Sequence, residues 1–210
     1  CADTVALIEA EGGKAMALGA DITDRAQVQA ALQELRTAFG PVTILVNNAG
    51  MAEFLPVEEL PDAQWDRMFA VNVRGTFIVT QEVIPDMKAA HWGRIVNISS
   101  SSAQTGTRAQ VHYAASKGAI ISMTRSLADD LGPHGITVNN IPPGSVMGTI
   151  MSEENRDRWP VPIEQITAAM PVRRLGVPED IANACTWLVK EESGYVTGQT
   201  IGVNGGRVVS

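Results

Sequence analysis

Thiols and imidazoles are scarce in this chain of 210 residues. It has two cysteines, Cys1 and Cys185, and three histidines, His91, His112 and His134. The cysteines are too few and too far apart for a disulfide framework or a thiolate metal site. The histidines stand singly, without the spacing of a zinc-binding motif. The sequence therefore predicts a protein with no metal site and with reduced cysteines.

Long apolar runs and clustered positive charge are missing as well. The longest apolar runs, such as 44–46 and 120–123, are far too short to cross a bilayer. No charged segment followed by an apolar one opens the chain, so we expect no secretion signal, no membrane partner and a cytoplasmic protein. The net charge of −7 is spread along the chain and leaves no basic face for nucleic acid. With 45% hydrophobic residues, the chain can bury one core, and we expect a single domain over residues 1–210.

Short apolar runs alternate with longer segments of helical spacing. Strands are predicted over 14–21, 42–50, 93–102, 135–144 and 198–206. Helices are predicted over 24–40, 61–90, 111–131, 163–170 and 178–189. This alternation is typical of a doubly wound parallel sheet, with helices on both faces in three α/β/α layers. The expected fold class is α/β and Rossmann-like.

Polar or glycine-rich turns follow four of the predicted strands. They begin at Asp21, at Asn47, at Ser99 and at Pro143. In open parallel sheets, ligands bind outside the carboxyl ends of the strands. Four such turns on one edge indicate an elongated ligand lying across it. The alternative is that the strand ends carry only the residues that any turn requires.

Tyr113 and Lys117 are four residues apart in the small-residue segment 111–120. On a helix, this spacing places both side chains on one face. A nearby ammonium favours the phenolate and is expected to lower the pKa of the phenol from its ordinary value of about 10. A phenol so adjusted can exchange protons with a substrate. The alternative is an amphipathic helix with an exposed tyrosine and lysine.

An ordered set of motifs resembles the short-chain dehydrogenase/reductase family. The motifs are NNAG (47–50), NVRG (72–75), GRIVNISS (93–100), YAASK (113–117), VNNIPPG (138–144), RRLGVPEDIA (173–182) and GYVTGQTIGVNGG (194–206). They cover essentially the whole chain in the expected order. The resemblance implies a compact NAD(P)-binding enzyme that transfers a hydride between the nicotinamide and a ketone or secondary alcohol.

The resemblance also implies four catalytic residues. Tyr113 is the general acid/base, and Lys117 supplies the neighbouring cation and holds the nicotinamide ribose. Ser100, thirteen residues before the tyrosine, hydrogen-bonds the substrate oxygen, with Ser101 as the weaker alternative. Asn72 positions a water in a proton relay, or it is a buried amide that caps or kinks its helix.

For the cofactor, NAD or NADP, the resemblance implies three groups of residues. Asp21 and Ile22 lie at the adenine, although an acidic residue here also suits a helix N-cap, a role better filled by Thr23 or Asp24. The turn beside the adenine ribose supplies Asn48, Ala49 and Gly50. The segment under the nicotinamide supplies Pro143, Gly144, Val146 and Thr149, together with Tyr113 and Lys117 themselves.

The sequence departs from the family pattern at two places. The T-G-x-x-x-G-x-G turn that cradles the pyrophosphate is not found, and residues 1–21 are similar to the end of the second helix and the third strand. We therefore expect the leading βαβ unit, which usually decides between NAD and NADP, to be missing from this chain. The nicotinamide-contacting threonine is replaced by Gly148, so that Thr149 is expected to take its role.

The segment after residue 144 forms the substrate lid in this family. Its apolar side chains favour an uncharged ketone or alcohol: Val146, Met147, Ile150, Met151, Trp159, Val161 and Ile163. Reductases of acyl-carrier-protein ketones tend to have arginines where this chain has His91 and His134. A reductase of acyl-carrier-protein ketones nevertheless stays an alternative. A catalytically silent nucleotide-binding homologue is another alternative, and a nucleotide-sugar epimerase or dehydratase is a less favoured one. The resemblance further implies a homodimer or homotetramer paired through the helix at Tyr113 and the helix near Val71.

Overall fold

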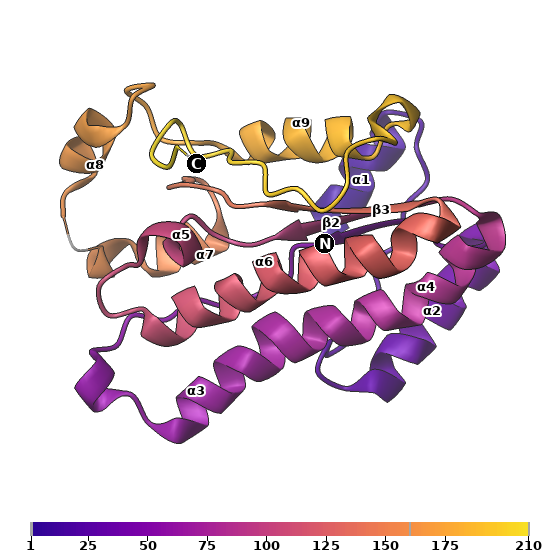
Figure 1. The fold of residues 1–210 in the computed structure, drawn as a ribbon, viewed down its shortest axis with the longest axis horizontal. Coiled ribbons are helices and arrows are strands. Elements are labelled where there is room, and N and C mark those ends of the chain that lie inside the picture. The colour runs from indigo at the N-terminus through magenta and orange to yellow at the C-terminus, as the bar shows by residue number, and fades with distance from the viewer. Residues whose placement is uncertain (1, 160, 210) are drawn as a thin grey trace.

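The computed structural model describes residues 2–159 and 161–209 and contains a parallel sheet between layers of helices (Figure 1). Its strands are β1 (Ile44–Asn47), β2 (Gly93–Ile98) and β3 (Ile136–Ile141), hydrogen-bonded in that order and all parallel. The α-helices are α1 (Ala2–Ala10), α2 (Arg25–Phe39), α3 (Asp62–Phe69), α4 (Thr76–Ala90), α5 (Ser102–Thr105), α6 (Val111–Leu131), α7 (Ile150–Glu154), α8 (Ile163–Ala169) and α9 (Pro178–Leu188).

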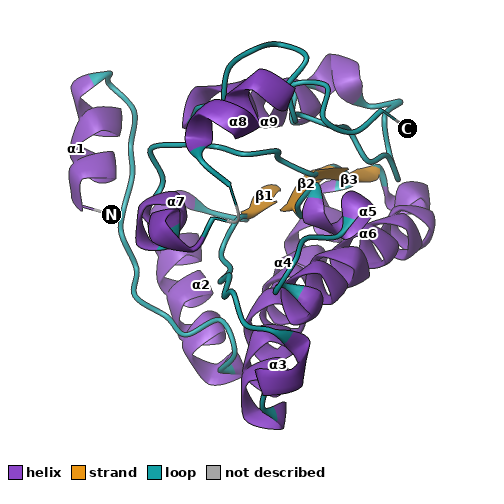
Figure 2. Ribbon diagram, turned by 90° about the vertical axis from the view of Figure 1, so that its left-hand side faces the viewer, coloured by secondary structure: helices purple, strands orange, loops and turns teal. Residues whose placement is uncertain are grey.

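Helices cover both faces of the sheet, as the sequence predicts (Figure 2). On one face α4 and α6 pack against the strands, while α9 packs against β2 and β3 on the other (Figure 1). Strand β3 is buried at every position, and β2 nearly so. The core between α4, α6 and the sheet includes Val83, Met87, Ile95, Ile136 and Val138. The fold class, a doubly wound three-layer α/β/α arrangement, is confirmed.

Local signals at the helix ends match the predicted boundaries. Asp24 is the N-cap of α2, and its carboxylate accepts hydrogen bonds from the backbone N–H groups of Ala26 and Gln27. Gly40 follows that helix with φ of 87°, a conformation that glycine adopts without steric cost. Helix α6 spans the predicted residues 111–131 and gives way to a short 3₁₀ turn containing Pro133.

The predicted helix over 61–90 contains a feature that its periodicity did not reveal. Between α3 and α4, the turn η2 (Ala70–Gly75) is π-helical. Asn72 lies in this turn and Gly75 closes it. A Cβ on Gly75 would lie 2.7 Å from the side chain of Ile22, so the glycine allows the segment before α2 to pack directly on the turn. Wider π-turns of this kind are frequent at functional sites.

Two predicted strands are wrong or incomplete. Residues 14–21 are largely exposed, irregular backbone and pair with no strand in the described part of the chain, and an isolated extended segment has no hydrogen-bonding neighbour to stabilise it. Residues 198–206 run beside β3 but make only isolated parallel bridges, Asn140 to Thr200 and Pro143 to Val203. Pro142 and Pro143 have no N–H to donate, which prevents a continuous ladder.

Candidate active site

Tyr113 and Lys117 lie together at the first turns of α6, next to the carboxyl end of β2. Both side chains are buried, with exposed fractions of 8% for Tyr113 and 5% for Lys117. The Nζ of Lys117 donates a hydrogen bond of 3.0 Å to the carbonyl oxygen of Ile98 and lies 5.9 Å from the centre of the Tyr113 ring. The alternative of an exposed tyrosine and lysine on a surface helix is therefore wrong.

The predicted direction of the tyrosine pKa shift is also wrong. Burial raises the pKa of Tyr113, and a hydrogen bond with the Ser100 hydroxyl acts in the opposite direction. The Lys117 ammonium donates its hydrogen bond to the Ile98 carbonyl and not to the phenol. Burial lowers the pKa of Lys117 itself to about 8. At neutral pH the site therefore combines a protonated phenol with a largely protonated amine.

Ser100 is the serine that the structure brings to the phenol. Its hydroxyl is close enough to the phenol to counteract the rise in the Tyr113 pKa, and it accepts a hydrogen bond of 3.1 Å from the backbone N–H of Ser102. Ser101 instead occupies the N-cap position of α5, and its carbonyl accepts from the backbone N–H groups of Gln104 and Thr105. The family resemblance favoured Ser100 by its interval of thirteen residues, and the nearness of its hydroxyl to the phenol supports the same choice.

Asn72 joins three segments around the site. Its Oδ1 accepts a hydrogen bond of 2.8 Å from the backbone N–H of Met51, and its Nδ2 donates to the Met51 carbonyl at 3.0 Å. The same Nδ2 lies 3.0 Å from the Ser116 hydroxyl on α6. The side chain is 1% exposed. Asn72 thus fastens the NNAG turn to the catalytic helix. It is a buried amide, as its alternative anticipated, but it links two segments instead of capping its own helix.

Three of the residues expected at the adenine side line a cavity of about 180 Å³, whereas Asp21 and Gly50 are not part of its lining. Ile22, Asn48 and Ala49 line it, together with Thr76 from α4. Asp21 is exposed, and its Oδ1 accepts hydrogen bonds of 2.8 Å from the backbone N–H and hydroxyl of Thr23, which lower the pKa of its carboxyl. Asp24, not Asp21, is the helix N-cap.

The residues expected at the nicotinamide follow the carboxyl end of β3. The backbone N–H of Gly144 donates to the carbonyl of Val203, and a Cβ on Gly144 would lie 3.0 Å from Asn204. Val146 forms a parallel bridge with Gly176. Gly148 has φ of 77°, and Thr149 is the N-cap of α7, with its Oγ1 accepting from the backbone N–H of Ser152.

These residues fit a dinucleotide in two respects. A Cβ on Gly50 would lie 3.1 Å from Asn72 Oδ1 and 3.3 Å from Lys117 Nζ, so the bare backbone keeps the space beside the amine open. Lys117 carries three N–H donors, and its one hydrogen bond to another described residue goes to Ile98. The remaining donors suit the hydroxyl groups of a ribose.

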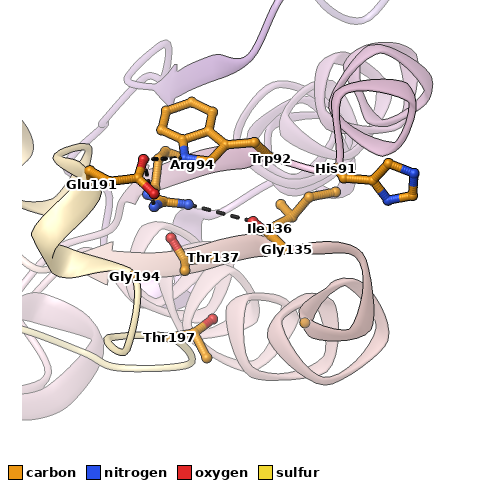
Figure 3. Close-up of a pocket in the computed structure, with 10 residues that line it drawn as sticks. His91, Trp92, Arg94, Gly135, Ile136, Thr137, Glu191, Gly194 and Thr197 are labelled. Carbon is orange, nitrogen blue, oxygen red and sulfur yellow. Dashed lines mark hydrogen bonds and ion pairs between the residues drawn. The ribbon is translucent and has the colours of Figure 1, made fainter.

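A larger cavity of about 330 Å³ lies at the opposite edge of the sheet (Figure 3). It borders the amino ends of β2 and β3, and the 3%-exposed Arg94 is its main charged group. The guanidinium lies 4.4 Å from the centre of the Trp92 ring, and the Trp92 indole N–H donates to Glu191 at 2.6 Å. Arg94 also donates to the Gly93 carbonyl at 2.9 Å. These contacts join the last helical segments to the sheet, far from the serine, tyrosine and lysine.

Two asparagines of the NNAG and GRIVNISS motifs form a buried hydrogen-bond network with helix residues outside the motifs. Asn47 donates to Thr80 and to Asn97, and Asn97 donates to Thr124, at distances of 2.8–2.9 Å. This buried chain of side chains connects β1 and β2 to α4 and α6 just below the catalytic edge. Asparagines in otherwise apolar, buried strands are the sequence signal that points to such a network, since buried amides require partners.

Two further findings concern metals and membranes. Within residues 2–159 and 161–209, no group of three or more histidine, cysteine, aspartate or glutamate side chains is placed to hold a metal ion. In the same part of the chain, each helix is too short or too polar to cross a bilayer.

A doubly wound parallel sheet with a serine, a tyrosine and a lysine at its carboxyl edge is typical of dinucleotide-dependent oxidoreductases. Comparisons with known proteins narrow this class. A family model described as "Enoyl-(Acyl carrier protein) reductase" matches residues 2–207. Nodulation protein G of Azospirillum brasilense is 41% identical over 199 residues, which are 94% of this chain and 79% of that protein.

Two other similar proteins have stated activities. Acetoacetyl-CoA reductase of Cupriavidus necator is 36% identical over 186 residues, 89% of this chain and 74% of that protein. The structure of NAD+-bound xylitol dehydrogenase superposes with a TM-score of 0.91 at 29% identity, covering 98% of this chain and 84% of that one. The chain belongs to the short-chain dehydrogenase/reductase family. It is an NAD(P)-dependent oxidoreductase.

Proposed function

We propose that this protein reduces a small ketone, or oxidises the corresponding secondary alcohol, with Tyr113 as the proton donor or acceptor. The observation that carries this proposal is a buried phenol that lies near the Ser100 hydroxyl and beside a buried ammonium at the sheet's carboxyl edge. A phenol whose pKa is raised stays protonated at neutral pH. It is therefore ready to give a proton to a carbonyl oxygen.

The chain's own residues divide the proton chemistry among them. When bound, the nicotinamide supplies a hydride to the carbonyl carbon or accepts one from the alcohol. Tyr113 transfers the proton from its Oη to the substrate oxygen, and Ser100 donates a hydrogen bond to that oxygen as negative charge develops. Lys117 stabilises the resulting phenolate, and Asn72 holds the NNAG turn in place behind it.

The cofactor would extend along the carboxyl edge of the sheet. Asp21, Ile22, Asn48, Ala49 and Gly50 would hold its adenosine half around the cavity of about 180 Å³. At the other end, the nicotinamide half would contact Pro143, Gly144, Val146 and Thr149. The hydroxyl hydrogen of Thr149 stays available as a donor, since its Oγ1 acts as an acceptor in the helix cap.

Apolar side chains of the lid favour an uncharged substrate. Ile150 is 79% exposed and Val161 41% exposed on the segment that follows the nicotinamide residues. Such residues gain from covering an apolar ligand. A 3-oxoacyl thioester is the second candidate, because acetoacetyl-CoA reductase is among the similar proteins.

A substrate panel tests the proposal directly. The full-length protein is assayed with small aliphatic, cyclic and aromatic ketones and with acetoacetyl-CoA, each with NADH and with NADPH. We expect turnover of uncharged ketones, at least a thousandfold loss in Tyr113→Phe, and an unchanged melting temperature in that variant. Ordinary turnover by Tyr113→Phe refutes the proton-transfer role, and exclusive use of the thioester selects the second candidate. Inactivity on every compound supports a silent nucleotide-binding protein instead.

A second copy of the chain is proposed to cover the outer faces of α4 and α6. Phe77 on α4 is 42% exposed and Val111 on α6 is 43% exposed, although both are large apolar side chains. Helices that are apolar on several faces are usually buried on several faces. We expect a homodimer or homotetramer in light scattering, and Phe77→Glu should shift it to a smaller species.

Two wider features are part of the same proposal. Residues 1–210 would act as one cofactor-binding domain, because the residues assigned to both halves of the cofactor lie along one sheet edge. The protein would work in the cytoplasm, where NAD(P) is reduced and reoxidised. Cooperative unfolding in calorimetry tests whether the chain is one domain, and cell fractionation tests the cytoplasmic location.

A further inference from the structure

His112 is a fully buried histidine directly before the catalytic tyrosine, at the second position of α6. Neither Nδ1 nor Nε2 makes a hydrogen bond to another described residue. Desolvation lowers the pKa of the imidazole, so the ring is neutral at pH 7 and carries one N–H donor. A buried donor without an acceptor is costly. The position therefore calls for a partner that the ring reaches during the reaction.

Glu53 is the group placed to be that partner. Its Oε2 lies 3.9 Å from His112 Nε2, and its side chain is 28% exposed, which leaves it room to rotate. This separation exceeds a hydrogen bond, yet it is too short for a bridging water, because two hydrogen bonds of about 2.8 Å at a water molecule span roughly 4.5 Å. A movement of about 1 Å closes the pair directly.

No other charge competes for the ring in the described part of the chain. The elements packed against this end of α6 carry Asp62, Asp66 and Arg67 on α3, Arg74 in η2 and Arg108 before α6, and none of them forms an ion pair with His112. Helix α5 has no charged residue. The imidazole thus faces a single carboxylate.

Glu53 lies in the middle of a segment that is tied to the active site at both ends. Met51 is held by Asn72 through two hydrogen bonds. The backbone N–H of Leu55 donates to the carbonyl of Ala109 at 2.7 Å, just before the catalytic helix. The central part of the segment, around Glu53, has no backbone anchor of this kind. The segment follows directly on Gly50, where a Cβ would lie 3.3 Å from Lys117 Nζ, so it begins next to the catalytic amine.

We propose that His112 and Glu53 form a latch that closes segment 51–55 onto the catalytic helix when substrate binds. The Nε2–H of His112 donates to Glu53 Oε2 in the closed state, with no proton transferred between them. His112 is then a positioning residue: it acts on the substrate through the segment and touches neither substrate nor cofactor. The proposal rests on the proposed function, because the segment begins beside Lys117 of that same site.

Paired variants of the full-length protein separate a latch from simple packing. His112→Leu has a similar volume but no donor, whereas His112→Gln keeps an N–H near the position of Nε2. We expect His112→Leu to raise the KM for the ketone roughly three- to tenfold, the size of one lost hydrogen bond, with the KM for the cofactor unchanged. His112→Gln should stay within about twofold of the parent protein.

The carboxylate is tested in the same way. Glu53→Ala should raise the KM for the ketone as much as His112→Leu does. The double variant, with both Glu53→Ala and His112→Leu, should be no worse than either single variant. Glu53→Gln keeps an acceptor and should retain most of the affinity for the ketone. The exposed Glu59→Ala is the matched control and should leave the KM unchanged. Equal impairment of His112→Leu and His112→Gln, additive effects in the double variant, or an unchanged KM in His112→Leu each refute the latch.

Amide hydrogen exchange provides a readout that does not depend on turnover. In the presence of NAD+ or NADP+ and a saturating ketone, residues 51–55 should exchange faster in His112→Leu than in His112→Gln. This mixture of oxidised cofactor and ketone requires no turnover. If the parent protein reduces no ketone, the proposed function fails, but the exchange comparison in this mixture still tests the latch. Equal exchange in the two variants overturns the latch even when the enzyme is active.

Discussion

The Nζ of Lys117 donates a 3.0 Å hydrogen bond to the carbonyl oxygen of Ile98, the last residue of β2. This bond fastens the catalytic helix to the carboxyl edge of the sheet. A neutral carbonyl stabilises an ammonium less than a carboxylate does, and burial lowers the pKa of Lys117 to about 8. The charge next to the phenol is therefore present at neutral pH but is lost under mildly alkaline conditions.

The rate of ketone reduction should follow the charge on Lys117. Because the folded-state pKa is about 8, the ammonium is present below that pH and disappears as the pH rises through it. We expect kcat/KM for reduction to fall with one deprotonation near pH 8, while burial keeps Tyr113 protonated over this range. Steady-state rates between pH 6 and 10 give the profile. A rate that stays constant up to pH 10 would contradict the assignment of the limb to Lys117.

Replacement of Lys117 by methionine should make the protein more stable and inactive. The lysine is protonated in both the folded and the unfolded state at pH 7, but in the folded state the charge is desolvated. We expect the melting temperature at pH 7 to rise by several degrees, and the gain over the parent protein to shrink between pH 8 and 10.5 as the buried amine loses its proton. Calorimetry of both proteins at pH 7 and at pH values between 8 and 10.5 checks these expectations. A lower melting temperature in Lys117→Met would contradict it.

Gly50→Ala should impair catalysis more than folding. The added Cβ would lie 3.1 Å from Asn72 Oδ1 and 3.3 Å from Lys117 Nζ, tighter than ordinary contacts, so the amide or the amine must move by a few tenths of an ångström. We expect kcat to fall roughly tenfold or more, since small displacements of catalytic groups are costly. Gly118→Ala is the control, because its Cβ would meet nothing within 4 Å. Both variants are compared by kcat and by circular dichroism.

The stability of the protein should fall in mild acid because of His112. Desolvation lowers the pKa of this imidazole below its ordinary value of 6.5, so below pH 6.5 the unfolded chain binds a proton that the folded chain does not. The stabilisation is complete above pH 6.5 and is lost as the pH falls toward the folded-state pKa. We expect the drop in melting temperature from pH 7.5 to 5.5 to be smaller in His112→Leu than in the parent protein. Equal drops would show that His112 is not the group responsible.

Much of the candidate site could be identified from short sequence intervals. Tyr113 and Lys117 share a helix, and their four-residue spacing brings both to the same buried face. Ser100 follows from the thirteen-residue interval and meets the phenol as expected. The direction of the Tyr113 pKa shift could not be obtained in this way. It depends on how completely other elements remove water from the ring, and no local spacing encodes that.

The same distinction applies to the fold. Alternating apolar patterns determined the order of the elements and the α/β class, because the periods of helices and strands are properties of the local backbone. The strand predicted over 14–21 failed, since pairing requires a neighbour that periodicity cannot supply. Only the tertiary structure decided the π-helical turn at Asn72 and the approach of Glu53 to His112. Both depend on contacts between residues remote in the chain, whose free energy arises only when the layers pack.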